Sequence, residues 1–234
     1  MKPYYQEPNI IIINDDCLNA MKELPDKSID LVLTDPPYIQ DNHGGGDNKN
    51  WWRNLNQTGH LEFVSNGFSD EILNEFERVC KIVNILIFCS NKQISKLMNF
   101  FEMRKYSTTL LAWHKKNAIP FGNGKYISDI EFILFVRGKN APFNNSTNKE
   151  NSKLFQYNYP TANRLHPTEK PIEILSRLLK IHSNENDTIL DPFLGSGTTA
   201  RACKDLGRKC IGIEISKKYC DIAVQRLAQE VLSF

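Results

Sequence analysis

A carboxylate, two prolines and an aromatic ring follow directly on one short apolar run of the chain. The run spans residues 29–34, and Asp35, Pro36, Pro37 and Tyr38 come next. Because two prolines fix the backbone and remove two N–H donors, neighbouring carbonyl groups are left as acceptors. An acid, a carbonyl group and an aromatic face are the groups needed to hold an aromatic amine. A Pro-Pro strand terminator beside a structural tyrosine is the alternative, but the flanking acid and ring favour a binding site.

A glycine-rich turn follows a second apolar run, at residues 188–190. Gly195, Gly197 and Ala200 fit the pattern G-x-G-x-x-G/A, in which glycines let the backbone approach a ligand closely. Glu214 lies 19 residues after Gly195 at the end of the next apolar run, where a carboxylate can accept hydrogen bonds from ribose hydroxyls. The pattern predicts a site for an adenosine-containing cofactor, and a tight strand-to-helix turn is the alternative.

Asp191 distinguishes between two such cofactors, a dinucleotide and S-adenosylmethionine. It stands at the end of the apolar run, just before the glycines. A carboxylate at this place would repel a pyrophosphate, whereas it can face the cationic α-amino group of S-adenosylmethionine. The acid therefore favours S-adenosylmethionine.

Short β-branched runs alternate with helical patterns along the chain, which predicts a mostly parallel sheet covered by helices on both faces. Ligands of such sheets bind outside the carboxyl ends of the strands, and both turns described above follow a strand. Residues 39–68, with three consecutive glycines, and residues 138–168 are expected to be irregular. We expect strands over 9–14, 29–34, 84–89, 107–113, 130–137, 188–190 and 209–213, and helices over 17–24, 69–81, 92–101, 171–182, 197–206 and 216–232.

Length and composition are those of one soluble α/β domain: 234 residues, 41% hydrophobic and 24% charged. No apolar stretch approaches the roughly 18 residues that cross a bilayer, and the first residues do not resemble an export signal. We therefore expect a cytoplasmic protein whose six cysteines are reduced and buried. The sequence contains neither a metal-ligating histidine spacing nor the phosphate-binding loop motif of nucleoside-triphosphatases, so we expect no metal ion and no NTPase activity.

Positive charge is concentrated in the middle of the chain. The formal net charge is only +2, but residues 101–170 carry 11 Lys and Arg against 5 Asp and Glu. Such a segment is typical of a surface that faces a polyanion, and equally of an ordinary solvated face.

The two turns in this order resemble a known family. D-P-P-Y at 35–38, followed far downstream by D-P-F-L-G-S-G-T-T at 191–199, is similar to the β group of the amino-directed DNA methyltransferases. H-P-T-E-K-P at 166–171 resembles the segment before the cofactor helix of that group. N-D-D-C at 14–17 resembles its acidic turn at the cofactor adenine. The resemblance covers about residues 9–230.

The resemblance implies a Rossmann-like, doubly wound sheet with an antiparallel strand near one edge, for which 107–113 and 130–137 are the candidate edge pair. It implies one methyltransferase domain over 1–234, with DNA-contacting insertions near 39–68 and 114–168. S-adenosylmethionine is the implied cofactor, and the residues expected to bind it are Asp16, Asp35, Lys170, Asp191, Phe193, Gly195, Ser196, Gly197, Thr198 and Glu214.

The implied reaction is methylation of an exocyclic amine of a base flipped out of duplex DNA. Asp35 and the Pro36 carbonyl would accept the two N–H bonds of the amine, Pro37 would stiffen the turn, and Tyr38 would stack on the base. An Asp at the first position is more frequent in adenine-N6 enzymes of the family than in cytosine-N4 enzymes, so we expect adenine and keep cytosine as the alternative.

Contacts to double-stranded DNA are expected from a Trp-Trp-Arg segment in the glycine-rich stretch and from the basic middle. Two other classes stay open, an NAD(P)-dependent oxidoreductase and an inactive DNA-binding subunit. The sequence also leaves open a homodimer and a separately acting restriction endonuclease. The candidate DNA-binding residues are Trp51, Trp52, Arg53, Lys115, Lys116, Lys125 and Arg164.

Overall fold

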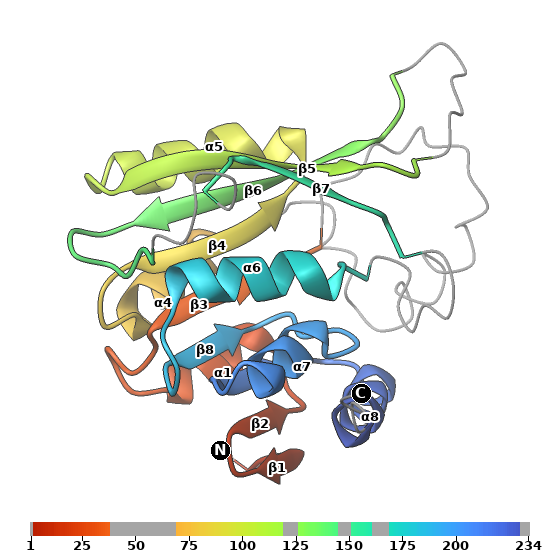
Figure 1. Cartoon of the computed structure of the whole chain (residues 1–234). Coiled ribbons are helices and arrows are strands. Elements are labelled where there is room, and N and C mark those ends of the chain that lie inside the picture. The colour runs from red at the N-terminus through yellow and green to blue at the C-terminus, as the bar shows by residue number, and fades with distance from the viewer. Residues whose placement is uncertain (1, 38–68, 119–125, 145–150, 161–168, 230–234) are drawn as a thin grey trace.

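A single twisted sheet forms the centre of the protein. The computed structural model describes residues 2–37, 69–118, 126–144, 151–160 and 169–229. Within these ranges nine strands follow one another across the sheet in the order β1-β2-β9-β8-β3-β4-β6-β5-β7. Figure 1 shows β5 and β7 at one side of the sheet and β1 and β2 at the other. The strands are β1 (Tyr5–Glu7), β2 (Ile10–Ile13), β3 (Leu31–Thr34), β4 (Asn84–Cys89), β5 (Ser107–Lys115), β6 (Ile130–Arg137), β7 (Leu154–Tyr157), β8 (Thr188–Asp191) and β9 (Lys209–Ile213).

Parallel pairing prevails, as the sequence predicts. The neighbours β2 and β9, β9 and β8, β8 and β3, β3 and β4, and β5 and β7 all run parallel. The strand β6 is antiparallel to both β4 and β5, and β1 is antiparallel to β2. The carboxyl ends of β2, β9, β8, β3 and β4 therefore lie along one edge of the sheet, which is where the predicted cofactor and catalytic turns emerge.

Helices cover both faces of the sheet. Successive side chains of a strand point to opposite faces, and the apolar side chains on each face form a separate core with the helices packed there. In β4, Leu86 and Phe88 belong to one core, whereas Ile85, Ile87 and Cys89 belong to the other. Helices α6, α7 and α8 pack on the first face, and α1, α4 and α5 pack on the second (Figure 1). Their bounds are α1 (Cys17–Glu23), α4 (Asp70–Val79), α5 (Asn91–Glu102), α6 (Ile172–His182), α7 (Thr198–Asp205) and α8 (Lys217–Ala228).

Side-chain caps start two of these helices directly after a strand. The Asp16 carboxylate accepts the backbone N–H groups of Leu18 and Asn19, at 2.9 and 3.2 Å, and begins α1. The side-chain oxygen of Gln93 accepts the backbone N–H of Ser90 at 2.9 Å and begins α5. These caps keep the connections short, so the loops at the carboxyl edge are held closely.

The sequence-based prediction was wrong in four respects. Residues 138–168 are not irregular throughout, because β7 pairs with β5 and forms the edge beyond it. The predicted edge pair, β5 and β6, is therefore internal. The strand β1 was missed, and the last helix ends at Ala228 instead of residue 232, with Gln229 as its C-cap.

The six cysteines are free and buried, which confirms that prediction. Among the described residues, we find no helix of the length and apolarity that would cross a membrane.

Candidate active site

The two chemically suggestive turns lie side by side at the carboxyl edge of the sheet. Asp35 follows Thr34, the last residue of β3, and Asp191 is the last residue of the neighbouring strand β8. The Thr34 hydroxyl donates a hydrogen bond to Oδ1 of Asp191 at 3.0 Å. The strand order thus joins residues that stand 157 positions apart in the sequence. Besides burial, the negative charge of Asp35 is close enough to help raise the pKa of Asp191, so the acids of the two turns lie near each other.

Asp191 is a buried carboxylate with neutral hydrogen-bond donors around it. Only 2% of its surface is exposed, and its Oδ1 also accepts the backbone N–H of Phe193 at 3.1 Å. Burial raises the pKa of Asp191 to about 7, although hydrogen bonds from Thr199, Phe193 and Thr34 oppose the shift. A cation placed beside this carboxylate would hold it ionised, so the residue suits the binding of an ammonium group.

The glycines of the second turn have different physical tasks. Gly195 and Gly197 both adopt positive φ angles, 54° and 83°. A Cβ atom on Gly197 would lie 2.7 Å from Cβ of Ala223, so this glycine allows α7 and α8 to pack closely. A Cβ atom on Gly195 would meet no heavy atom within 4 Å. The backbone at Gly195 therefore borders open space that a ligand can approach.

Glu214 closes this turn from the end of β9. Its carboxylate accepts the backbone N–H of Gly195 at 2.9 Å and that of Ser216 at 2.8 Å. Burial raises the pKa of Glu214, against the lowering effect of these backbone hydrogen bonds. The acid predicted to bind a ribose is thus placed beside the open backbone of Gly195.

Asp35 forms an ion pair that the sequence analysis did not foresee. Nζ of Lys170 donates to Oδ2 of Asp35 at 2.6 Å and lies 3.2 Å from Oε2 of Glu131. The Lys170 side chain is 4% exposed; burial alone would lower the pKa of its ammonium, but the two carboxylates outweigh it and raise that pKa to about 12. The resemblance places Lys170 among the cofactor ligands, and the structure pairs its ammonium with Asp35. The neighbouring Pro37 carbonyl accepts Nε2 of Gln93 at 3.4 Å.

Three residues of the site escaped the sequence analysis. Glu131 partners Lys170, and Glu169 forms an ion pair with Arg226 of α8 at 2.9 Å. Arg226 also donates to the Thr198 hydroxyl at 3.0 Å. Glu169 is thus linked through Arg226 to the glycine-rich turn, and the adjacent Lys170 is linked to Asp35 of the D-P-P-Y turn. A lone acid at the start of the apolar strand β6 was the available signal for Glu131, and Arg226 had none.

The remaining predicted residues are distributed as follows. Phe193 is half-buried, and the buried Ser196 hydroxyl lies 3.5 Å from Nη2 of Arg226. Asp16 caps α1, two strands away from Asp191. Lys116 is exposed. Outside the described residues lie Tyr38, Trp51, Trp52, Arg53, Lys125 and Arg164.

Lys115, one of the predicted DNA-binding residues, forms an ion pair within the fold. Its side chain is 13% exposed, and its ammonium lies 2.7 Å from Oε1 of Glu131. The charge of Lys115 is therefore paired with Glu131 within the fold. The neighbouring Lys116 is exposed, and it takes part in none of the ion pairs found among the described residues.

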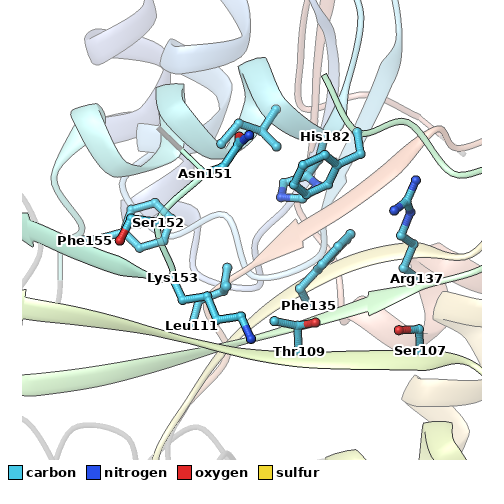
Figure 2. Close-up of a pocket in the computed structure, with 12 residues that line it drawn as sticks. Ser107, Thr109, Leu111, Phe135, Arg137, Asn151, Ser152, Lys153, Phe155 and His182 are labelled. Atoms are coloured by element: carbon cyan, nitrogen blue, oxygen red, sulfur yellow. The ribbon is translucent and has the colours of Figure 1, made fainter. Parts of the chain in front are cut away.

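A pocket of about 220 Å³ lies away from this site, between β5, β6 and α6 (Figure 2). Ser107, Phe135, Arg137 and His182 contribute to its wall. Arg137 pairs with Asn84, the first residue of β4, so the pocket opens where the parallel strands begin. Asp35 and Asp191 lie at the other end of these strands. Among the described residues no three His, Cys, Asp or Glu side chains gather as a metal site would require.

Comparison with known proteins identifies the family. The N6/N4 methyltransferase family model, described as DNA methylase, matches residues 29–225. The type II methyltransferase M.HpaI of Haemophilus parainfluenzae is 32% identical over 247 aligned positions, covering 95% of this chain and 76% of that protein. M2.LlaDCHI of Lactococcus lactis subsp. cremoris is 31% identical, with 97% and 92% covered. The chain therefore belongs to the N6/N4 DNA methylase family, which confirms the predicted resemblance.

Solved structures agree with this assignment. The M1.HpyAVI–SAM complex matches with a TM-score of 0.69 at 29% identity, over 93% of this chain and all of that one. The cytosine-N4-specific PvuII methyltransferase matches with a TM-score of 0.76 at 17% identity, over 99% and 91% of the two chains, and is similar in fold. The predicted Rossmann-like sheet is confirmed, and S-adenosylmethionine is the cofactor of the family.

Proposed function

We propose that this chain transfers a methyl group from S-adenosylmethionine to N6 of adenine in a short site of duplex DNA. One observation carries the proposal: the Thr34–Asp191 hydrogen bond at 3.0 Å sets the D-P-P-Y acid beside the glycine-rich turn. An amine held by Asp35 and a methyl donor held over Gly195 would then meet, and proximity of this kind supplies much of a displacement rate.

The residues of the glycine-rich turn fit S-adenosylmethionine. Gly195 leaves room for a ligand against the backbone, Glu214 offers carboxylate oxygens to ribose hydroxyls, and Asp191 suits the α-amino group. The sulfonium group of the bound cofactor supplies an activated methyl. The remaining work falls to the D-P-P-Y turn, which must orient an amine whose lone pair is delocalised into the base.

Asp35 and Pro36 would perform that orientation. Two acceptors beneath the N–H groups favour a pyramidal nitrogen and aim its lone pair at the methyl group. The Asp35 carboxylate also stabilises the positive charge that develops on the nitrogen. Tyr38, the last residue of the D-P-P-Y motif, would stack on the extruded base, an interaction that contributes about 1–3 kcal/mol. Lys170, whose Nζ lies 2.6 Å from Oδ2 of Asp35, would hold this carboxylate in place before the amine arrives.

Sequencing of modified bases tests the target directly. DNA is taken from a methylation-deficient host that expresses the chain and is read by a long-read method that detects methylated bases. We expect N6-methyladenine in one short sequence context, of roughly 4–6 base pairs, as suits a chain whose insertions are too small for an independent core. Methylcytosine instead would assign the chain to cytosine-N4 chemistry, and unmodified DNA would favour the inactive DNA-binding subunit.

Substitution of Glu214 tests the cofactor site. We expect Glu214→Ala to weaken S-adenosylmethionine binding at least about tenfold, because charge-assisted hydrogen bonds are worth roughly 1.5–3 kcal/mol each. Calorimetric titration with S-adenosylmethionine, and with NAD as the competing hypothesis, gives the affinity. Glu185→Ala at the other end of the sheet, where the acid is exposed, is the control. An unchanged dissociation constant for Glu214→Ala would mean that this acid only stabilises the turn and does not bind the cofactor.

Adjacent lysines provide a matched test of DNA binding. Lys116 is exposed, whereas Lys115 is held by Glu131 at 2.7 Å. If Lys116 neutralises one phosphate, Lys116→Ala should flatten the dependence of log K on log salt by about 0.9, and Lys115→Ala should leave the slope unchanged. Binding to duplex DNA is measured at several salt concentrations. Equal slopes in the parent and in Lys116→Ala would show that DNA binds on another surface.

A further inference from the structure

Four charged side chains of alternating sign form a continuous row that ends on Asp35. Lys115 of β5 lies 2.7 Å from Oε1 of Glu131 in β6. Oε2 of Glu131 lies 3.2 Å from Nζ of Lys170, which lies 2.6 Å from Oδ2 of Asp35. Glu131 thus uses each of its oxygens for a different ammonium group, and Lys170 is shared by two carboxylates.

Three of the four side chains in this row are largely shielded from solvent. Their exposed fractions are 4% for Lys170, 13% for Lys115 and 15% for Glu131, against 23% for Asp35. Nζ of Lys170 also lies 5.3 Å from the centroid of the Phe88 ring, which offers it a weaker electrostatic contact. Low exposure makes the loss of one charged partner costly, because the charge that remains is neither solvated nor neutralised.

The position of Glu131 in the sheet explains how its side chain reaches the neighbourhood of Asp35. Glu131 pairs in register with Trp113, near the carboxyl end of β5, and the next residue of β6 pairs with Cys89, the last residue of β4. Glu131 therefore lies at the same edge as Asp35 but enters from the antiparallel strand. Through Lys170 it connects the β5–β6 hairpin to Asp35.

We propose that Glu131 is a positioning residue for methyl transfer. Glu131 competes with Asp35 for the Lys170 ammonium, and so sets how strongly that ammonium attracts the Asp35 carboxylate. This inference rests on the proposed function. With Glu131 uncharged, the ammonium of Lys170 is drawn fully to Asp35. The Asp35 carboxylate then attracts the developing charge on the target nitrogen less strongly. The chemical step slows, while the affinities for cofactor and DNA stay the same.

Glu131→Gln tests the proposal, since it removes the charge at nearly constant volume. We expect the single-turnover rate of methyl transfer to fall about tenfold, with dissociation constants for S-adenosylmethionine and duplex DNA within about twofold of the parent. Glu75→Gln is the matched control: Glu75 is 14% exposed and pairs with Arg78 at 2.7 Å on α4, away from the site. That variant should keep the parent rate. Equal rates in Glu131→Gln and the parent would overturn the proposal.

A double-mutant cycle separates positioning from general stability. If Glu131 acts through Lys170, Glu131→Gln should lower the rate in the parent but cause no further loss in a Lys170→Met background. Two losses that multiply would mean that Glu131 acts independently of Lys170, which contradicts the proposal. Thermal melting of all four proteins shows whether each is folded at the assay temperature.

Glu131→Asp decides the matter if the glutamine variant does not fold. It keeps the charge but withdraws it by one methylene, so the contact with Lys170 at 3.2 Å is lost and a slower rate at the parent's affinities is expected. A parent-like rate in this variant overturns the proposal. Failure of the parent chain itself to methylate DNA would instead refute the proposed function.

Discussion

Asp35→Asn is expected to lower the rate of methyl transfer roughly a hundredfold, and Asp35→Ala to abolish it. The amide oxygen of asparagine still accepts one N–H bond of the target amine, but the negative charge that stabilises the developing cation is gone. Removal of one such preorganised electrostatic contact costs on the order of 3 kcal/mol in the transition state. Labelled methyl incorporation into DNA, under single-turnover conditions, measures the effect.

Asp30→Asn is the matched control for this substitution. Asp30 precedes the same strand, pairs with Lys81 at 2.8 Å and is 18% exposed, against 2.6 Å and 23% for Asp35 with Lys170. It lies at the opposite end of β3, so its loss should change stability and leave the methylation rate unaltered. An Asp35→Ala variant within tenfold of the parent rate would refute the role of Asp35.

Gly197→Ala is expected to destabilise the fold by about 2–5 kcal/mol, more than Gly195→Ala. Both positions require a left-handed backbone, φ 83° and 54°, which costs a non-glycine residue about 1–2 kcal/mol. Only at Gly197 does the new Cβ collide, 2.7 Å from Cβ and 2.9 Å from Cα of Ala223, and overpacking of this kind adds roughly 1–3 kcal/mol. Chemical denaturation of both variants measures the difference.

Gly195→Ala should act on the cofactor instead. Its Cβ would meet no heavy atom of the protein within 4 Å, so the free energy of unfolding should fall by only about 1–2 kcal/mol, the cost of the left-handed backbone. The affinity for S-adenosylmethionine should fall, because the new methyl group would occupy space that the cofactor needs. Calorimetric titration of the two variants, at a temperature where both are folded, separates these effects. If Gly195→Ala binds S-adenosylmethionine as the parent does, the cofactor does not approach this backbone.

Strands with strong local patterns were predictable from the sequence. The runs 84–89 and 130–137 are apolar enough to be buried on both faces, and their predicted bounds agree with β4 and β6. The strand β7 has no such signal, because Leu154–Tyr157 alternates in a polar stretch and is held by its pairing with β5. Pairing of this kind depends on residues distant in sequence, so the edge of the sheet was misplaced.

The site was predictable to the extent that its chemistry is local. The acids at the ends of β3 and β8 could be placed at one edge from the alternation of strands and helices alone. Their contact through Thr34 depends on the strand order, which the local pattern does not specify. Lys170 illustrates the limit: its ammonium binds an acid 135 positions away, so only the folded chain assigns it to Asp35.

The identity of the methylated nucleoside decides whether the chain methylates N6 of adenine and whether Asp35 is needed for that reaction. The purified chain is incubated with labelled S-adenosylmethionine and DNA from a methylation-deficient host, the DNA is digested to nucleosides, and the label is located by mass spectrometry. Asp35→Asn is run in parallel. We expect N6-methyldeoxyadenosine from the parent and about a hundredfold less from Asp35→Asn. Label in N4-methyldeoxycytidine, or equal yields from the two proteins, would contradict this expectation.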